Sequence, residues 1–397
     1  MVSVTVETPP RTTLLVPRWA GVVCLSLGIF IIVTSEILPV GLLNPIAADF
    51  GVSVGTGGLL MTLPGLVAMV SAPLATVATA RFDRRLMLML FMLLLAVANL
   101  LTAAAPAYWL VLVGRGLVGL VIGGYWSIGA GLSSRLVPRR SVATATAIIF
   151  AAVPVGSVLG IPLGTQLGES VGWRVSFAVL CGLSMAVATA LRWALPSLPA
   201  LQATSAAVLF GLLRRPGVRS GLLVTALIVI AHFGAYTYVT PFLRDTTGAG
   251  KATVGGYLLI YGLAGIAGTM STSRTLARSL RGTLAVSAGL IAVATLLLPL
   301  LGHRPAGAIA LLVVWGLAYG TIPACSQTWF ARSAPHATEA ATVLFTSSFQ
   351  ATLAFGALVG GMVVDAASTR AVMLCAGVLA GITAVVVTLA RTPRADR

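Results

Sequence analysis

One acidic residue, Glu36, lies in the middle of the apolar segment IIVTSEILPVGLL, residues 31–43. A charged side chain at the centre of a bilayer costs about 2.5 kcal/mol or more, so acids in such segments usually face a polar cavity and have a function. We interpret Glu36 as a group that binds and releases a proton. The alternative is a permanently protonated carboxyl that packs against a neighbouring helix. Pro39, one turn later, removes a backbone hydrogen bond, which predicts a kink and a free carbonyl beside the carboxyl.

One arginine, Arg115, is placed well inside a predicted membrane span rather than at its end, in the segment LVGRGLVGLVIGG. It can stabilise a carboxylate or a substrate, or respond when Glu36 changes charge. The alternative is that its side chain reaches back to the outer headgroups. The acidic residues other than Glu36 are assigned to tails and loops: Glu7, Asp49, Asp83, Glu169, Asp245, Glu339, Asp365 and Asp396.

Aromatic and amide side chains inside the predicted spans form a second candidate set. The members are Trp126, His232, Tyr236, Tyr238, Trp315, Tyr319, Gln327 and Gln350. Stacking faces beside hydrogen-bonding groups suit a flat, neutral solute, so we assign this set to a substrate cavity. Each residue alone is more often ordinary helix packing.

Two further segments predict parts that move. In ARFDRRLML, Asp83 is followed by Arg84 and Arg85 at a loop between spans, which is either a surface ion pair or a latch that breaks during a conformational cycle. In PVGSVLGIPLGTQLG, small residues recur every four positions beside a proline, which predicts a bent helix that a neighbour approaches closely. The residues concerned are Gly156, Gly160, Pro162 and Gly164.

The elements that must position these residues are membrane helices. The chain has 397 residues, 58% of them hydrophobic and 9% charged, with a mean hydropathy of +1.02. An apolar run of roughly 20 residues crosses the hydrocarbon core as a helix. The sequence predicts an all-α membrane protein with twelve spans, at 19–46, 57–80, 86–105, 108–133, 142–168, 175–195, 218–243, 252–273, 283–301, 306–331, 338–362 and 370–390.

The net charge of +16 is interpreted as topology, because the basic residues lie in short clusters between apolar runs rather than in stripes on a soluble domain. With the N-terminus in the cytoplasm, most of the Lys and Arg residues fall on the inner side. The outer side receives Arg174, Arg244, Lys251, Arg304 and Arg370. We therefore expect a multi-pass protein of the bacterial cytoplasmic membrane with both termini cytoplasmic, in contact with anionic lipids and not with nucleic acid.

The chain divides into two predicted halves of six helices, residues 1–195 and 218–397. A cytoplasmic linker at 196–217, rich in proline and small polar residues, joins them. A shift of 200 residues aligns LVGRGLVGLVIGG with LVVWGLAYGTIPA, and a shift of 202 pairs Pro39 with Pro241 and Glu36 with Tyr238. A duplicated bundle around a central cleft accounts for both matches.

Enzymatic and metal-dependent functions are not indicated. The four cysteines form no C-x-x-C pair, and the chain contains neither a P-loop nor an H-E-x-x-H motif, so no metal or cofactor is expected. GVSVG, residues 51–55, matches the G-x-S-x-G nucleophile pattern. The outer loop in which it lies is too short for the strand, turn and helix that the motif requires.

Several motifs together resemble the major facilitator superfamily, within its proton-coupled drug and solute exporters. SEILPVGLL is similar to a helix 1 signature of that branch, GRGLVGLVIGG to the helix 4 motif and GSVLGIPLG to the helix 5 motif. In addition FDRRLM, RLVPRR, GWRVSF, LPSLP, RRPGV and WGLAYGTIP resemble the bacterial purine ribonucleoside efflux pumps. One departure from the general pattern is Thr79, four residues before Asp83, where a glycine is usual.

The resemblance implies a monomeric antiporter that exports a small solute, foremost purine ribonucleosides, in exchange for protons. Glu36 is then the counterpart of the helix 1 acid and Arg115 of the helix 4 arginine, and the glycines of residues 156–164 belong to the helix 5 motif. The alternatives are a chloramphenicol-like or multidrug proton antiporter, and a facilitator or sensor of the same fold without proton coupling.

Overall fold

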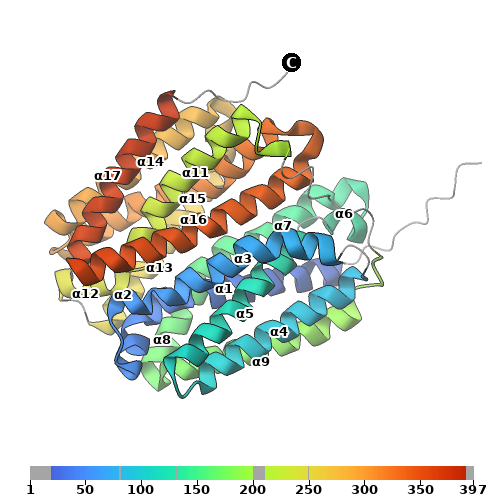
Figure 1. The fold of residues 1–397 in the computed structure, drawn as a ribbon, viewed down its shortest axis with the longest axis horizontal. Coiled ribbons are helices and arrows are strands. Elements are labelled where there is room, and N and C mark those ends of the chain that lie inside the picture. The colour runs from blue at the N-terminus through green and yellow to red at the C-terminus, as the bar shows by residue number, and fades with distance from the viewer. Residues whose placement is uncertain (1–18, 80–81, 130–131, 200–210, 249, 390–397) are drawn as a thin grey trace, which may run out of the picture.

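The computed structural model describes residues 19–79, 82–129, 132–199, 211–248 and 250–389. In these ranges every regular element is helical, and twelve helices are long and apolar enough to cross a membrane (Figure 1). They correspond one to one with the twelve predicted spans, which confirms the all-α membrane fold. Residues 200–210 of the predicted linker lie outside the described ranges.

The first half contains α1 (Trp19–Phe50), α2 (Val54–Gly57), α3 (Leu59–Ala78), α4 (Arg84–Ala104), α5 (Tyr108–Gly129), α6 (Ser133–Leu136), α7 (Val142–Val155), α8 (Ile161–Val171) and α9 (Trp173–Ala194). The second half contains α11 (Pro216–Tyr236), α12 (Val239–Thr247), α13 (Lys251–Arg278), α14 (Leu280–Leu301), α15 (Pro305–Ser333), α16 (Thr338–Ala366) and α17 (Thr369–Leu389). We call the end with Trp19 and Leu389 the inner end, following the predicted orientation, and the opposite end the outer end.

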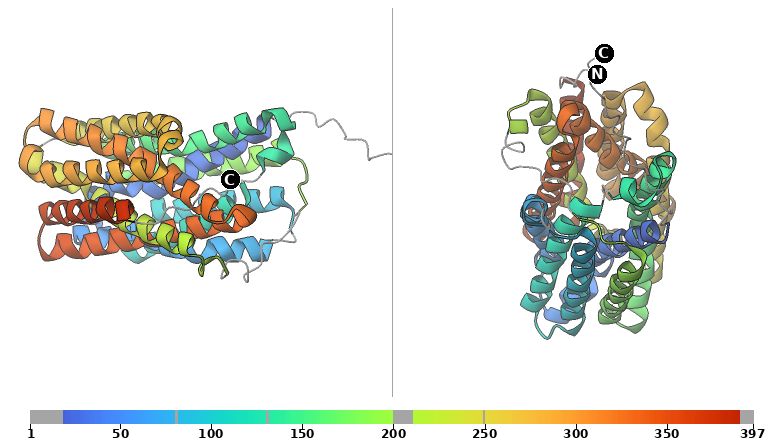
Figure 2. Two further views of the ribbon diagram at one scale, coloured as in Figure 1. Left: turned by 90° about the horizontal axis from the view of Figure 1, so that it is seen from above. Right: turned by 90° about the vertical axis from the view of Figure 1, so that its right-hand side faces the viewer.

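The two halves form neighbouring bundles whose helices run along the same direction (Figures 1 and 2). Each half has its own buried apolar core, and large apolar side chains such as Leu74 and Met362 point outward, as a lipid-facing surface requires. Near the outer end α3 packs on α16 and α1 on α12, and Val40, Leu43 and Met61 of the first half join the core of the second. The two halves are therefore packed together at this end.

Proline and glycine explain where two of the helices depart from the predicted spans. The span expected at 218–243 is divided at Thr237 and Tyr238, because Pro241 has no N–H to bond the carbonyl four residues earlier. The span expected at 142–168 passes through a π-helical turn, Gly156–Gly160, between α7 and α8. Such single π-turns inside helices often occur at functional sites.

The assignment of acidic residues to loops was wrong for five of them. These five lie in the first or last turn of a helix: Asp49 in α1, Glu169 in α8, Asp245 in α12, and Glu339 and Asp365 at the two ends of α16. The helices continue past their apolar stretches, because the backbone hydrogen bonds of a helix do not stop where the hydrocarbon layer ends. Glu7 and Asp396 lie outside the described ranges.

Candidate functional site

Glu36 joins the two halves of the molecule. It lies near the middle of α1 with 8% of its surface exposed, and its Oε1 accepts a hydrogen bond of 2.8 Å from Nε2 of Gln350 on α16. A carboxamide has both donors and an acceptor, so Gln350 can hydrogen-bond a carboxylate and, after rotation of the amide, a protonated carboxyl. The arrangement can therefore accommodate both protonation states of Glu36.

Arg115 is completely buried and fixes the backbone of α1 and α3. Its Nη1 and Nη2 donate to the carbonyl oxygens of Ser35 and Glu36 at 2.6 and 2.7 Å, and its Nε donates to the carbonyl oxygen of Leu60 at 2.8 Å. The side chain thus points into the bundle, and the interpretation that it reaches the outer headgroups is wrong. Its hydrogen bonds go to main-chain carbonyls rather than to the Glu36 carboxylate.

Two prolines explain why an arginine is needed at this point. The carbonyls of Ser35 and Leu60 would accept helical hydrogen bonds from residues 39 and 64, and both positions are proline, which has no N–H. Arg115 supplies the missing donors to both carbonyls. Its fork of five N–H groups suits several acceptors at once, which an ammonium group does not.

The second half has a related contact at the position that the 200-residue shift matches to Arg115. Trp315 on α15 donates from Nε1 to Nδ1 of His232 on α11, at 3.1 Å, and both side chains are buried. An indole nitrogen is a donor only, so His232 is neutral at Nδ1 and carries its proton on Nε2. The residues that the 200-residue shift matches, Arg115 and Trp315, therefore each hydrogen-bond the fourth long helix of a half to its first long helix.

Aromatic rings gather around His232. Its imidazole is stacked on Tyr319 with a centroid distance of 3.4 Å and on Tyr236 at 5.2 Å, and Trp315 meets it edge-on at 5.7 Å. Tyr261 on α13 packs against Tyr236 and Trp315, and its hydroxyl is buried without a hydrogen-bond partner among the described residues. Tyr319 lies within electrostatic range of Glu36. The cluster is thus a neighbour of the acid.

Three residues of the predicted cavity lie elsewhere. Trp126 is at the inner part of α5 and packs on the core of the first half. Tyr238 is fully buried at the outer seam, where its hydroxyl donates to the carbonyl of Ala357 at 2.7 Å. Gln327 is two turns further inward along α15 than Tyr319. Tyr261, which belongs to the cluster, was missed, because one tyrosine in an apolar span carries no signal of its own.

The glycines of the helix 5 segment contact α1 directly beside Glu36. A Cβ on Gly160 would lie 2.2 Å from Oγ1 of Thr34, and one on Gly164 would lie 2.5 Å from Leu38. Gly156 faces the same helix at Phe30 and Val33. Pro162 is in the first turn of α8, directly after the π-turn. The close neighbour that the glycine spacing predicts is therefore α1.

Asp83 holds the inner end of the first half together through hydrogen bonds. It is the N-cap of α4 and accepts from the N–H groups of Arg85 at 2.8 Å and Leu198 at 3.1 Å, and from the hydroxyl of Ser197. Burial raises the pKa of Asp83, but these hydrogen bonds together lower it further, so the net pKa lies below the ordinary value. The carboxylate thus ties the loop before α4 to the start of the linker.

The two arginines after Asp83 extend this connection. Arg85 donates to the carbonyl of Leu195 at 3.2 Å, and Arg84 donates to the carbonyl and hydroxyl oxygens of Thr79 at 3.1 and 2.9 Å. Thr79, which stands where a glycine is usual, therefore serves as a partner for Arg84.

The outer end carries contacts between the halves that the sequence did not predict. Arg244 on α12 donates to Glu169 on α8 at 2.5 Å. Asp365 at the end of α16 accepts from the hydroxyl of Ser53 at 2.6 Å and from the N–H of Gly55 at 2.9 Å. These residues are separated by 75 positions or more in the chain, so no local pattern could have paired them.

A cavity of about 450 Å³ lies beside the ion pair of Glu169 and Arg244, and Asn44 and Trp173 help to line it. Among the described residues, the outer seam is thus held by the ion pair of Glu169 and Arg244 and by hydrogen bonds to helix ends.

Comparisons with known proteins agree with this architecture. Residues 25–350 match the family model of the Major Facilitator Superfamily. The chain is 34% identical over 379 residues to the purine ribonucleoside efflux pump NepI of Salmonella paratyphi A, with 94% of each chain covered. It is also 34% identical over 362 residues to the transcription regulatory protein OpdE of Pseudomonas aeruginosa, with 87% of each covered.

Solved structures share the fold. A bacterial homologue of the human lysosomal transporter Spinster, inward-facing and unoccupied, superimposes with a TM-score of 0.71 at 18% identity, covering 94% of this chain and 96% of that one. The human organic anion transporter MFSD10 superimposes with a TM-score of 0.68 at 16% identity, covering 96% of this chain and 100% of that one. With twelve apolar helices and bacterial efflux relatives, the chain is a multi-pass inner-membrane protein. It belongs to the Major Facilitator Superfamily and is a membrane transporter rather than an enzyme.

Proposed function

We propose that this transporter exports purine ribonucleosides in exchange for protons. The observation that carries the proposal is Glu36, a buried acid in the middle of a membrane helix that is hydrogen-bonded to the opposite half through Gln350. A group at this position can make the packing of the two halves depend on its protonation state. The substrate class is supported by the name of the relative NepI, which is 34% identical over nearly the whole chain.

In the proposed cycle Glu36 takes a proton from the outside and loses it to the cytoplasm, and the substrate favours the deprotonated form. Alternating access to a site at the middle of the membrane is the general mechanism of transporters built from two such halves. Gln350 must rotate its amide to keep a hydrogen bond when Glu36 changes its protonation state, so the change is passed to α16. Arg115 holds α1 in place while its acid titrates.

The aromatic cluster is the proposed binding surface for the base of the nucleoside. His232, Tyr236 and Tyr319 form a stack of roughly parallel rings, and the hydroxyl of Tyr261 is a buried hydrogen-bonding group without a partner among the described residues. A planar heterocycle with polar edges is complementary to both features. Because Tyr319 lies within electrostatic range of Glu36, the charge on the acid would influence a substrate bound at the cluster.

Transport of inosine into inside-out vesicles tests the function. We expect radiolabelled inosine to accumulate when the vesicle interior is acidic, and the accumulation to collapse when a protonophore is added. Chloramphenicol in the same vesicles is the control for substrate class. Uptake of chloramphenicol in place of inosine would contradict the substrate assignment, and uptake of inosine that ignores the protonophore would contradict proton coupling.

The ion pair between Glu169 and Arg244 is expected to stabilise the state that is closed on the outer side. Each partner is mostly buried, with 8% and 21% of its side chain exposed, so removing one leaves an uncompensated charge. We predict that Arg244→Gln shifts the transporter toward the outward-open state. Labelling of an Asn44→Cys variant by an impermeant thiol reagent, applied from outside, should become several times faster.

The reversed pair, Glu169→Arg with Arg244→Glu, is the matched control for this prediction, and it should restore slow labelling. Equal labelling rates in all three backgrounds would show that the pair does not hold the outer side closed.

A second candidate is a sensor of the same fold, because the relative OpdE carries the name of a transcription regulatory protein. Such a protein would bind its solute without moving it. Equilibrium binding of inosine to the purified protein, without any gradient-dependent flux in vesicles, would favour the sensor over the antiporter.

A further inference from the structure

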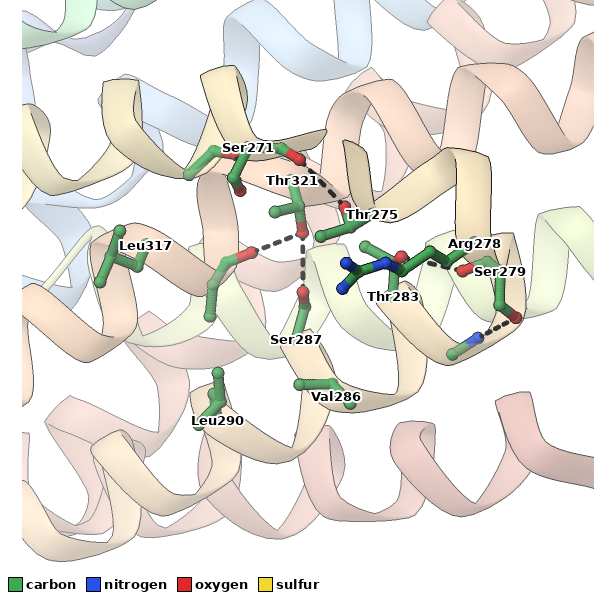
Figure 3. Close-up of a pocket in the computed structure, with 13 residues that line it drawn as sticks. Ser271, Thr275, Arg278, Ser279, Thr283, Val286, Ser287, Leu290, Leu317 and Thr321 are labelled. Atoms are coloured by element: carbon green, nitrogen blue, oxygen red, sulfur yellow. Dashed lines mark hydrogen bonds between the residues drawn. The ribbon is translucent and has the colours of Figure 1, made fainter. Parts of the chain in front are cut away.

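A groove on the lipid-facing side of the second half is not used by the proposed transport cycle. It has a volume of about 390 Å³ and lies between the inner parts of α13, α14 and α15 (Figure 3). One wall is apolar and open to the surroundings, since Val286, Leu290 and Leu317 are 63%, 40% and 38% exposed. The groove is therefore separate from the buried aromatic cluster and from Glu36.

A cationic group points into the polar end of the groove. Figure 3 shows Arg278 pointing along the groove, near the labelled Thr275 and Thr283 in this view, and all three residues line the groove. Arg278 has no hydrogen bond or ion pair with any residue that the structure describes. A guanidinium presents planar, paired N–H donors that match the oxygens of a phosphate. The end of the groove is thus suited to a phosphate group.

The hydroxyl groups around Arg278 offer acceptors. Thr275 donates its own hydroxyl hydrogen to the carbonyls of Ser271 and Thr272, and Thr283 donates to the carbonyl of Ser279 at 2.8 Å. With the hydrogens used in this way, the hydroxyl oxygens, which line the groove, keep lone pairs that can accept from a ligand. A ligand that carries hydrogen-bond donors beside its phosphate fits this pattern, and one that carries a methylated ammonium does not.

The depth of these groups matches a membrane lipid. The apolar run of α13 ends at Met270, after which the sequence reads STSRTLAR, and Arg278 is the last residue of the helix, so it lies beyond the apolar run at the level of the headgroups. Leu290 is eleven residues along α14 from Ser279, or roughly 17 Å deeper at about 1.5 Å per residue. The groove thus runs from a cation at the inner surface along an apolar wall into the hydrocarbon layer, as a phospholipid does.

We propose that this groove binds phosphatidylethanolamine from the inner leaflet. The phosphate is held by Arg278, the ammonium group donates to the oxygens of Thr275 and Thr283, and one acyl chain lies along Val286, Leu290 and Leu317. A phosphate alone would satisfy Arg278 but leave the apolar wall uncovered, so the whole lipid is the occupant.

Native mass spectrometry of the full-length protein in detergent tests the site, with phosphatidylethanolamine and phosphatidylcholine of the same acyl chains as probes. We expect phosphatidylethanolamine to bind more tightly, and Arg278→Gln to weaken its binding about tenfold, the value of one hydrogen bond to a charged group. Thr283→Val should narrow the difference between the two lipids, because it removes an acceptor and keeps the shape.

Arg304→Gln is the matched control, since Arg304 is an exposed arginine at the other end of α14 and α15, and it should leave binding unchanged. Equal affinity for both lipids in the wild-type protein, tighter binding of phosphatidylglycerol than of phosphatidylethanolamine, or equal losses in the Arg278 and Arg304 variants would each overturn the proposal. Monodisperse gel filtration of every variant separates a lost site from a lost fold.

Discussion

Replacement of Glu36 by glutamine is expected to reduce proton-driven inosine uptake into inside-out vesicles to the level of vesicles without the protein. Glutamine has the same size as glutamate and can still hydrogen-bond with Gln350, but it cannot take up or release a proton at physiological pH. The variant therefore removes the proton and keeps the contact between the halves. Initial rates of uptake of radiolabelled inosine, with an acidic vesicle interior, measure the effect.

Exchange of labelled for unlabelled inosine in the absence of a gradient is the control. If Glu36 serves only the proton, the Glu36→Gln transporter should still exchange substrate at saturating inosine, because glutamine mimics the protonated form, which binds the substrate more weakly, and exchange does not require a net change in protonation. Gradient-driven uptake that persists in this variant would contradict the role of Glu36. Loss of both activities would instead point to the alternative in which Glu36 is a structural residue.

The number of protons exchanged for each nucleoside also follows from Glu36. Glu36 is the acid that the described chain places well inside a span, so one proton per neutral nucleoside is expected, and each cycle then carries one positive charge to the cytoplasm. A charge that crosses 100 mV is worth about 2.3 kcal/mol. An interior-positive potential of that size should raise inosine accumulation in inside-out vesicles by up to about fiftyfold. Uptake that is insensitive to voltage would contradict this stoichiometry.

The sequence predicted the helices well because each needs only a local apolar run, and all twelve spans have a counterpart in the structure. Glu36 and Arg115 were found because a charge in such a run stands out. Their hydrogen-bond partners could not be found in this way. Gln350 lies 314 positions from Glu36, and nothing in either segment states which helices meet.

The aromatic set shows where sequence reasoning stops. His232, Tyr236, Trp315 and Tyr319 were chosen by residue type, and they do meet, but Tyr238 was chosen by the same rule and packs in the outer seam. Residue type does not show which face of a helix is turned toward the cavity. The distribution of apolar residues around the helix does not show it either when the helix is apolar on every side. The contacts at Glu169 and Asp365 were missed for a related reason, since helix ends were taken as loops.

Replacement of Arg115 by methionine is expected to destabilise the folded transporter strongly. The carbonyls of Ser35 and Leu60 lie four residues before prolines, so without Arg115 neither has its donor. An unsatisfied buried carbonyl costs about 1–3 kcal/mol, which gives roughly 2–6 kcal/mol for the two. Thermal unfolding of the purified protein in detergent should show a much lower midpoint. The unfolding midpoint of Arg115→Lys should fall between those of the wild-type protein and Arg115→Met, because one ammonium group cannot reach all three carbonyls.

The prolines provide the decisive test of this explanation. Pro39→Ala and Pro64→Ala return an N–H to each of the two helices, so the triple variant with Arg115→Met should regain part of the lost stability. Pro45→Ala with Pro73→Ala is the matched control, because these prolines lie in the same two helices but neither follows, by four residues, a carbonyl that Arg115 contacts.

A thermodynamic cycle over Arg115 and the two proline pairs isolates the coupling from any general effect of alanine on helix stability. A rescue that is equal for both pairs would mean that Arg115 matters through its charge rather than through the donors that it supplies. A rescue confined to Pro39 and Pro64 would show that the arginine in α5 replaces the hydrogen bonds that those prolines remove. The kink beside Glu36 would then be a feature that Arg115 makes possible, and the acid could titrate in a helix whose broken backbone is already satisfied.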